Sequence, residues 1–129
     1  MVMEDQSNIL IVDDNISLCR TICMVLERKG CAVSTANSGR EAIEKMQESP
    51  FDPIFMDVKM PHMDGVETYR RIREIRPGAM VMMMTAYAVE DLVQEALQEG
   101  AYGIVYKPVD IKTLVAIIEE ARQGADEQG

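Results

Sequence analysis

Short apolar runs alternate with amphipathic segments five times along this chain. The runs are bounded by polar or turn-forming residues, which is typical of buried β-strands. They predict strands at residues 8–12, 32–36, 53–56, 80–84 and 103–106. The segments that follow each run have helical spacing and predict helices at about 15–29, 39–48, 65–75, 90–99 and 111–123. This regular alternation predicts an α/β fold built on a parallel sheet.

Capping residues support these boundaries. Residues that favour helix N-termini precede three of the helices: Ser38, Asp64 and Asp110. Ser38 also forms an S-x-x-E capping box with Glu41. Gly30 and Gly100 stand where a helix C-terminus needs a left-handed residue. Pro53 cannot donate to a strand ladder, so we place it at the start of its strand.

The length of 129 residues fits one domain. We predict that this domain covers residues 8–123 and that residues 1–7 and 124–129 are flexible ends. The segment 32–36 is the most polar predicted strand, which favours a place at an edge of the sheet.

Composition excludes several classes of function. The formal net charge of −9 argues against nucleic-acid binding, because phosphate contacts need Lys and Arg. No apolar stretch approaches the ~20 residues of a membrane span, so the expected location is the cytoplasm. Cys19 and Cys23, four residues apart, could share a metal, but small core residues are the favoured interpretation. His62, the single histidine, is expected in an exposed loop.

Polar residues follow four of the apolar runs directly. They are Asp13 and Asp14, Asp57, Thr85 and Lys107. Because parallel strands end at one edge of a sheet, these side chains should gather there. That edge is where open α/β folds bind ligands.

Three carboxylates at one edge repel one another, by about 4 kcal/mol per pair at ~4 Å and an effective dielectric near 20. Such a site needs protons or a cation, and its hard oxygen ligands suit Mg²⁺. Magnesium beside a carboxylate suggests phosphoryl transfer with an aspartate as the nucleophile. A carboxylate is already ionised at neutral pH, so no catalytic histidine is required.

Four segments resemble those of response-regulator receiver domains, the CheY-like family of two-component and phosphorelay signal transduction. They are ILIVDDN, MDVKMPHMDG, MMMTAYA and YGIVYKPVD, and the resemblance runs from about residue 8 to residue 122. It implies a doubly wound, flavodoxin-like (βα)₅ fold with strand order 2-1-3-4-5.

The resemblance also assigns a Mg²⁺ site. Asp14 would be a direct ligand, and Asp13 would act mainly through water. Asp57 would be both a ligand and the phosphoacceptor, and the Lys59 backbone carbonyl would complete the protein's share of ligands.

In the same family the phosphoryl group comes from a phosphohistidine on a sensor histidine kinase or a histidine phosphotransfer protein. Thr85 would turn toward the phosphoryl group and Lys107 would pair with it, and the Lys107–Pro108 bond would be cis. Phosphorylation would change affinity for an effector domain, a partner protein or a second copy of the chain.

The chain departs from the family pattern three residues before this lysine. Receivers usually carry Tyr or Phe there, and this chain has Ile104. Tyr106 is expected on the same face of the strand, and Tyr87 and Tyr102 lie nearby in sequence. Whether one of them replaces the missing aromatic stays open; core packing is the favoured role for Ile104 and a possible one for Tyr106.

Two further positions bear on the lifetime of the phosphorylated state. Residues two past Asp57 and two past Thr85 flank the path of the hydrolytic water in receivers. Here they are Lys59 and Tyr87, and neither is a carboxylate or carboxamide that orients water well. We therefore expect slow self-dephosphorylation.

The predicted function is a signalling switch rather than an enzyme, one that catalyses only its own aspartyl phosphorylation and slow dephosphorylation. One alternative is a Mg²⁺-dependent aspartyl-phosphate phosphatase, but Val58 and Lys59 supply no general acid beside the nucleophile. A second is a flavodoxin-like cofactor binder, which is disfavoured because the acidic edge would repel a flavin phosphate.

Overall fold

The computed structural model describes residues 8–86 and 90–128. Its strands are β1 (Asn8–Val12), β2 (Ala32–Ala36), β3 (Ile54–Asp57), β4 (Val81–Thr85) and β5 (Gly103–Tyr106). Its helices are α1 (Ile16–Arg28), α2 (Gly39–Glu48), α3 (Gly65–Ile75), α4 (Glu90–Gln98) and α5 (Ile111–Gln128). Strand and helix alternate as predicted, and most boundaries lie within one residue of the predicted positions.

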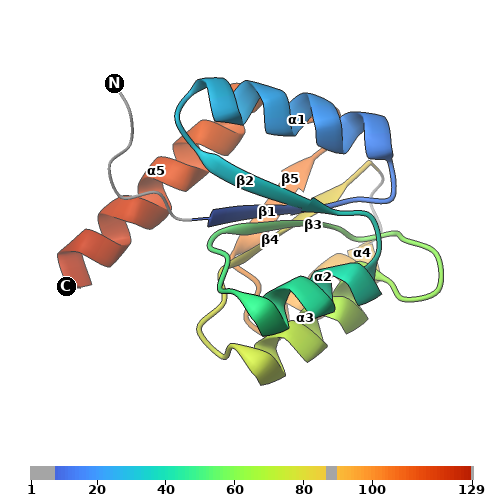
Figure 1. The fold of residues 1–129 in the computed structure, drawn as a ribbon. Helices are drawn as coiled ribbons and strands as arrows, with labels where there is room; N and C mark the ends of the chain where they lie inside the picture. The colour runs from blue at the N-terminus through green and yellow to red at the C-terminus, as the bar shows by residue number, and fades with distance from the viewer. Residues whose placement is uncertain (1–7, 87–89, 129) are drawn as a thin grey trace.

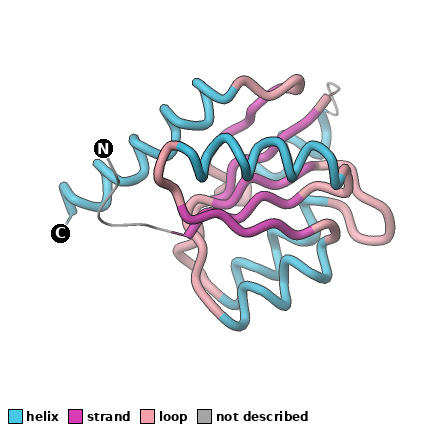
Figure 2. Tube along the Cα trace, turned by 45° about the horizontal axis from the view of Figure 1, so that its top comes forward, coloured by secondary structure: helices cyan, strands magenta, loops and turns pink. Residues whose placement is uncertain are grey.

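The five strands form one parallel sheet with the order β2-β1-β3-β4-β5. Helices α1 and α5 cover one face of the sheet, and α2, α3 and α4 cover the other (Figure 1). The tube view shows the same arrangement, with the strands side by side between two layers of helices (Figure 2). The predicted doubly wound fold and its strand order are confirmed.

Strand alternation divides the core into two layers. Leu10 and Val12 of β1 pack toward α2, α3 and α4, whereas Ile9 and Ile11 pack toward α1 and α5. The methionines of β4 follow the same rule. They are buried on both faces of the sheet and fill the core: Met82, Met83 and Met84.

The predicted helix caps and turn residues are present. The Ser38 side chain accepts a hydrogen bond from the Glu41 N–H, and Asp64 caps α3 in the same way. Gly30 and Gly100 have φ values of 91° and 112°, which favour glycine. The half-buried strand β2 lies at an edge of the sheet, as predicted, and Pro53 directly precedes β3.

One predicted boundary is wrong. We expected the last helix to end at about residue 123, but α5 continues to Gln128 (Figure 1). The flexibility of the two ends of the chain stays a prediction. Gly124 costs only about 1 kcal/mol relative to alanine within a helix, and the residues after it include no proline. Residues 1–7 and Gly129 lie outside the described part of the chain. No helix of the described part is long and apolar enough to cross a membrane.

Candidate functional site

Three carboxylates meet at the carboxyl edge of two neighbouring strands. Asp13 and Asp14 directly follow β1, and Asp57 is the last residue of β3. Ligand atoms of the three side chains all lie within 4.8 Å of one another. The gathering of acids that the sequence predicts is therefore present.

Asp13 is the buried member of the acid pair, with no side-chain exposure. Its Oδ1 accepts a hydrogen bond of 2.9 Å from the Asn15 N–H, and its Oδ2 accepts one of 2.6 Å from Lys107 Nζ. Asp14, by contrast, is exposed. The two neighbouring acids thus differ in role: both oxygens of Asp13 already accept bonds within the protein, while Asp14 faces solvent.

Lys107 brings positive charge to the acids from the end of β5. Its Nζ lies 3.4 Å from Asp57 Oδ1 in addition to its contact with Asp13. Burial lowers the pKa of Lys107, but its bond to Asp13 and the charge of Asp57 outweigh burial and leave the pKa raised. The ammonium therefore stays charged at neutral pH. The Lys107–Pro108 bond is cis, as the family resemblance implied.

Asp57 is almost fully buried, with 6% of its surface exposed. Burial raises the pKa of Asp57 to about 6, and the negative charge of Asp13 adds to this, while Lys107 opposes it. At neutral pH the carboxylate is ionised but poorly stabilised, so binding of a cation or a proton to it is favourable.

Two other predicted site residues, Thr85 and Lys59, lie at the carboxyl ends of β4 and β3. Thr85 is buried as the last residue of β4, and its backbone carbonyl accepts a 2.8 Å bond from the Lys107 N–H. Lys59 follows β3 and is exposed. Tyr87 lies outside the described residues.

Ile104 is partly buried and packs against the core that α2, α3 and α4 cover, as expected. Tyr106, in contrast, is 64% exposed, so core packing of this residue is the wrong interpretation. Tyr106 is the last residue of an edge strand, where less of the protein covers a side chain. The Tyr102 hydroxyl donates a 2.8 Å hydrogen bond to Glu120 of α5.

Sequence reasoning missed Asn37, which follows β2. Its side-chain amide donates a 3.0 Å hydrogen bond to the backbone carbonyl of Asp13. The available signal was the strand order, because β2 lies beside β1 and both strands end at the same edge of the sheet.

The cysteines and the histidine lie where the sequence placed them. Cys19 and Cys31 are buried, and Cys23 is half-buried. Burial, with the nearby Asp13, raises the pKa of Cys19 to about 11, so this thiol is an inert core group. His62 is exposed in the loop between β3 and α3.

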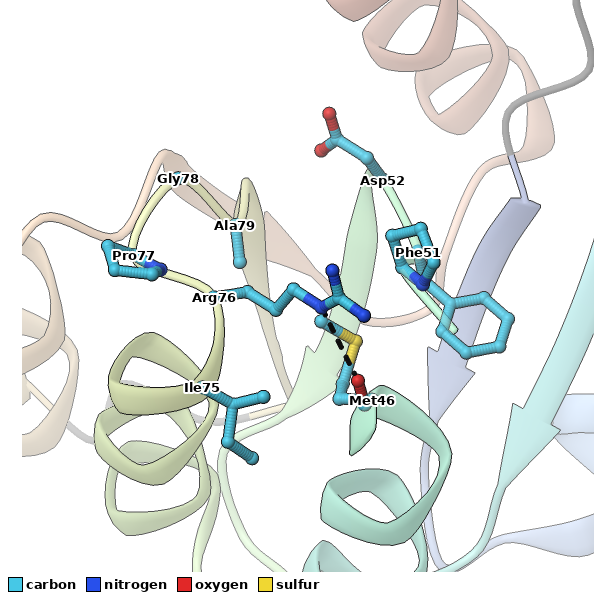
Figure 3. A pocket seen from close by; sticks show the side chains of 9 residues that line it. Met46, Phe51, Asp52, Ile75, Arg76, Pro77, Gly78 and Ala79 are labelled. Atoms are coloured by element: carbon cyan, nitrogen blue, oxygen red, sulfur yellow. Dashed lines mark hydrogen bonds between the residues drawn. The ribbon is translucent and has the colours of Figure 1, made fainter. Parts of the chain in front are cut away.

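A separate hollow of about 390 Å³ lies away from the acids (Figure 3). Its walls come from the end of α2, the segment before β3 and the turn after α3. Arg76 crosses it and donates a 3.5 Å hydrogen bond to the Met46 carbonyl. Within the described residues, the acid cluster is the one group of three potential metal ligands, and none of its members lines this hollow.

The family described as the response regulator receiver domain matches residues 9–119. The transcriptional regulatory protein ZraR of Escherichia coli K12 is 41% identical over 117 residues, which are 91% of this chain and 26% of ZraR. This chain therefore spans about a quarter of the length of that relative.

Two solved structures show the same fold. The first is a CheY-like receiver domain protein from Methanospirillum hungatei JF-1, with 30% identity and a TM-score of 0.91, covering 97% of this chain and 100% of that one. The second is the CheX–CheY–BeF3–Mg complex from Borrelia burgdorferi, with 30% identity and a TM-score of 0.80, covering 88% of this chain and 87% of that one.

Proposed function

Because this chain belongs to the response regulator receiver family, we propose that it works as a phosphorylation-dependent switch with Asp57 as the phosphoacceptor. The observation that carries the proposal is the setting of Asp57 at the carboxyl edge of β3. Its carboxylate is nearly buried, two more acids lie within 4.8 Å, and the Lys107 ammonium is 3.4 Å away.

The acids fit a hard divalent cation. Asp14 and Asp57 would provide carboxylate oxygens, the Lys59 backbone carbonyl would provide a third ligand, and Asp13 would act through water. Magnesium in this place would offset the repulsion among the acids and neutralise charge on the incoming phosphoryl group. The complex from Borrelia burgdorferi, which contains BeF3 and magnesium, supports this choice of ion.

The proposed reaction is a direct transfer. A carboxylate oxygen of Asp57 attacks the phosphorus of a phosphohistidine, a new O–P bond forms, and the P–N bond breaks. The leaving imidazole takes up a proton from solvent. Lys107 would pair with one phosphoryl oxygen, and the Thr85 hydroxyl would donate to another.

The partners we propose are a sensor histidine kinase or a histidine phosphotransfer protein on the donor side. On the output side we propose an effector domain, a partner protein or a second copy of the chain. ZraR is a transcriptional regulatory protein of which this chain spans about a quarter. With a net charge of −9 over its full sequence, the chain is a poor surface for nucleic acid itself. We place its activity in the cytoplasm.

We also propose that self-dephosphorylation is slow. The exposed Lys59 and the residue Tyr87 take the two positions that flank the water path in receivers, and neither orients water as a carboxamide does. A half-life of many minutes in purified protein is expected. A half-life of seconds, or no change of rate in Lys59→Asn combined with Tyr87→Glu, contradicts this part of the proposal.

The test of function is phosphorylation by acetyl phosphate with Mg²⁺, followed by intact mass. The wild-type protein should gain one phosphoryl group that hydroxylamine removes, and Asp57→Asn should gain none. Retention of the label in that variant refutes the assignment of the phosphoacceptor. Continuous release of many phosphates per chain would indicate the alternative, a phosphatase.

A further inference from the structure

Residues at the end of β2 hold the backbone of Asp13 on both sides. The Asp13 N–H donates a 3.0 Å hydrogen bond to the Ala36 carbonyl. The Asp13 carbonyl accepts a 3.0 Å hydrogen bond from Asn37 Nδ2 and a 3.4 Å contact from the thiol of Cys19. Because a thiol is a weak donor, the amide of Asn37 is the main restraint on this carbonyl.

Asn37 is itself held in place by helix α2. Its backbone N–H donates a 3.0 Å hydrogen bond to Glu41 Oε2, and the Glu41 carboxylate lies 3.7 Å from Lys45 Nζ. The Glu41 N–H in turn bonds to Ser38 at the start of the helix. Asn37 is therefore held by α2 through its backbone and contacts the end of β1 through its side chain.

The carbonyl that Asn37 holds belongs to the peptide between the two acids. A peptide group is planar, so fixing the Asp13 carbonyl also fixes the direction of the Asp14 N–H and Cα. The side chain of Asp13 is already held by Asn15 and Lys107. Asp14 is exposed, and the backbone is what directs it toward Asp57.

We propose that Asn37 is a positioning residue for the acid pair: it fixes the peptide between Asp13 and Asp14 and so aims the Asp14 carboxylate at the cation site. This inference rests on the proposed function, since it assumes that Asp14 binds Mg²⁺. Loss of the hydrogen bond from Asn37 to the Asp13 carbonyl would leave the acids present but less well aligned. The effect on metal affinity should be that of losing an outer-shell partner, which is typically 10–100-fold.

Calorimetric titration with MgCl₂ tests the proposal. Asn37→Ala should bind Mg²⁺ about tenfold more weakly than wild type, at the low end of the range for outer-shell partners because the restraint acts through the backbone. The matched control is Thr68→Val in α3, which also loses one hydrogen bond from a side chain to a main-chain carbonyl. It should lower the melting temperature and leave the Mg²⁺ affinity unchanged.

A second variant separates alignment from charge. Asn37→Asp keeps the size of the side chain and removes the donor. Its extra negative charge would by itself raise the affinity for a cation, so a loss of affinity in this variant supports positioning. Wild-type Mg²⁺ affinity in Asn37→Ala overturns the inference.

A measurement without metal keeps the inference apart from the proposed function. If the wild-type protein binds no Mg²⁺, the proposed function fails. The positioning of the Asp14 peptide is then decided by the amide resonance of Asp14 in ¹⁵N spectra. That resonance should shift in Asn37→Ala and stay in place in Thr68→Val; an unshifted Asp14 resonance in Asn37→Ala overturns the inference.

Discussion

The Lys107 ammonium lies 2.6 Å from the Asp13 carboxylate, closer than it lies to the candidate phosphoacceptor. The Asp13 side chain is completely buried, and that of Lys107 is 19% exposed. Two residues that are 94 positions apart in sequence therefore form a largely buried ion pair. In the unphosphorylated protein, the lysine already neutralises an acid other than Asp57.

Removal of this lysine should destabilise the fold. Lys107→Met leaves the buried Asp13 carboxylate without its counter-ion, and breaking a buried pair from one side should cost about 3 kcal/mol. Urea unfolding at pH 7 measures the loss, and Lys107→Met combined with Asp13→Asn should recover most of it. Lys112→Met, at an exposed lysine that is the second residue of α5, serves as the control. Equal stability of Lys107→Met and this control would show that the pair contributes nothing.

The raised pKa of Asp57 predicts a pH dependence of stability. Between its ordinary pKa of 3.8 and the folded value of about 6, the folded state keeps a proton that the unfolded state releases. The resulting stability is present at pH 4 and is lost as the pH rises through 6. Asp57→Asn should therefore be more stable than wild type at pH 7.5 without metal, by up to about 3 kcal/mol.

The difference between Asp57→Asn and wild type should shrink toward zero near pH 4. Denaturant unfolding in EDTA at a series of pH values measures it. A wild-type protein that is as stable as Asp57→Asn at pH 7.5 would show that the site does not disfavour the ionised carboxylate.

Gly65 lies so close to the site that a side chain would disturb it. A Cβ added there would lie 2.3 Å from the Asp57 carbonyl oxygen and 2.9 Å from the Val58 Cα. Gly65→Ala should therefore lose about 1–3 kcal/mol, as overpacked positions do, and should accept phosphoryl groups poorly. Gly78→Ala is the matched control, because its Cβ would meet nothing within 4 Å. Thermal melts and acetyl phosphate labelling compare the two; equal behaviour would contradict the steric argument.

Arg70 of α3 joins that helix to the end of α4. Its guanidinium donates to both Glu99 oxygens, with the shortest bond at 2.7 Å, and to Glu95 at 3.0 Å. A double-mutant cycle of Arg70→Ala and Glu99→Ala should give a clearly larger coupling than the same cycle on Arg71 and Glu67. That control pair lies 3.4 Å apart within α3 alone. Coupling of equal size in both pairs would contradict the role of Arg70 as a link between helices.

The local features of the fold were predictable because their causes are local. Apolar runs marked the strands, and Ser38 and Asp64 marked helix starts through bonds that span three residues. The meeting of Asp13 with Asp57 was predictable too, since it follows from parallel strands that end at one edge. The end of α5 was not predictable, because no strong helix-terminating residue marks it in the sequence.

The exact hydrogen-bond partners of side chains that lie far apart in sequence were not predicted. Asn37 reaches Asp13 across 24 positions, and Arg70 reaches Glu99 across 29. The Asn amide and the Arg guanidinium can each donate to several kinds of neighbour, and only the packed structure decides which partner each one meets. The exposure of Tyr106 depends in the same way on what the edge of the sheet leaves uncovered.

The strand order also bears on how the chain assembles. β1 lies between β2 and β3, so the first three strands form the centre and one edge of the sheet; β4 and then β5 each add beside the strand that precedes it in sequence. If the sheet grows in this order, the three acids meet when β3 pairs with β1, whereas Lys107 arrives with β5. Before β5 pairs, the partly formed sheet carries the three acids without the positive charge of Lys107. We expect the docking of the last strand to be the folding step most favoured by electrostatics.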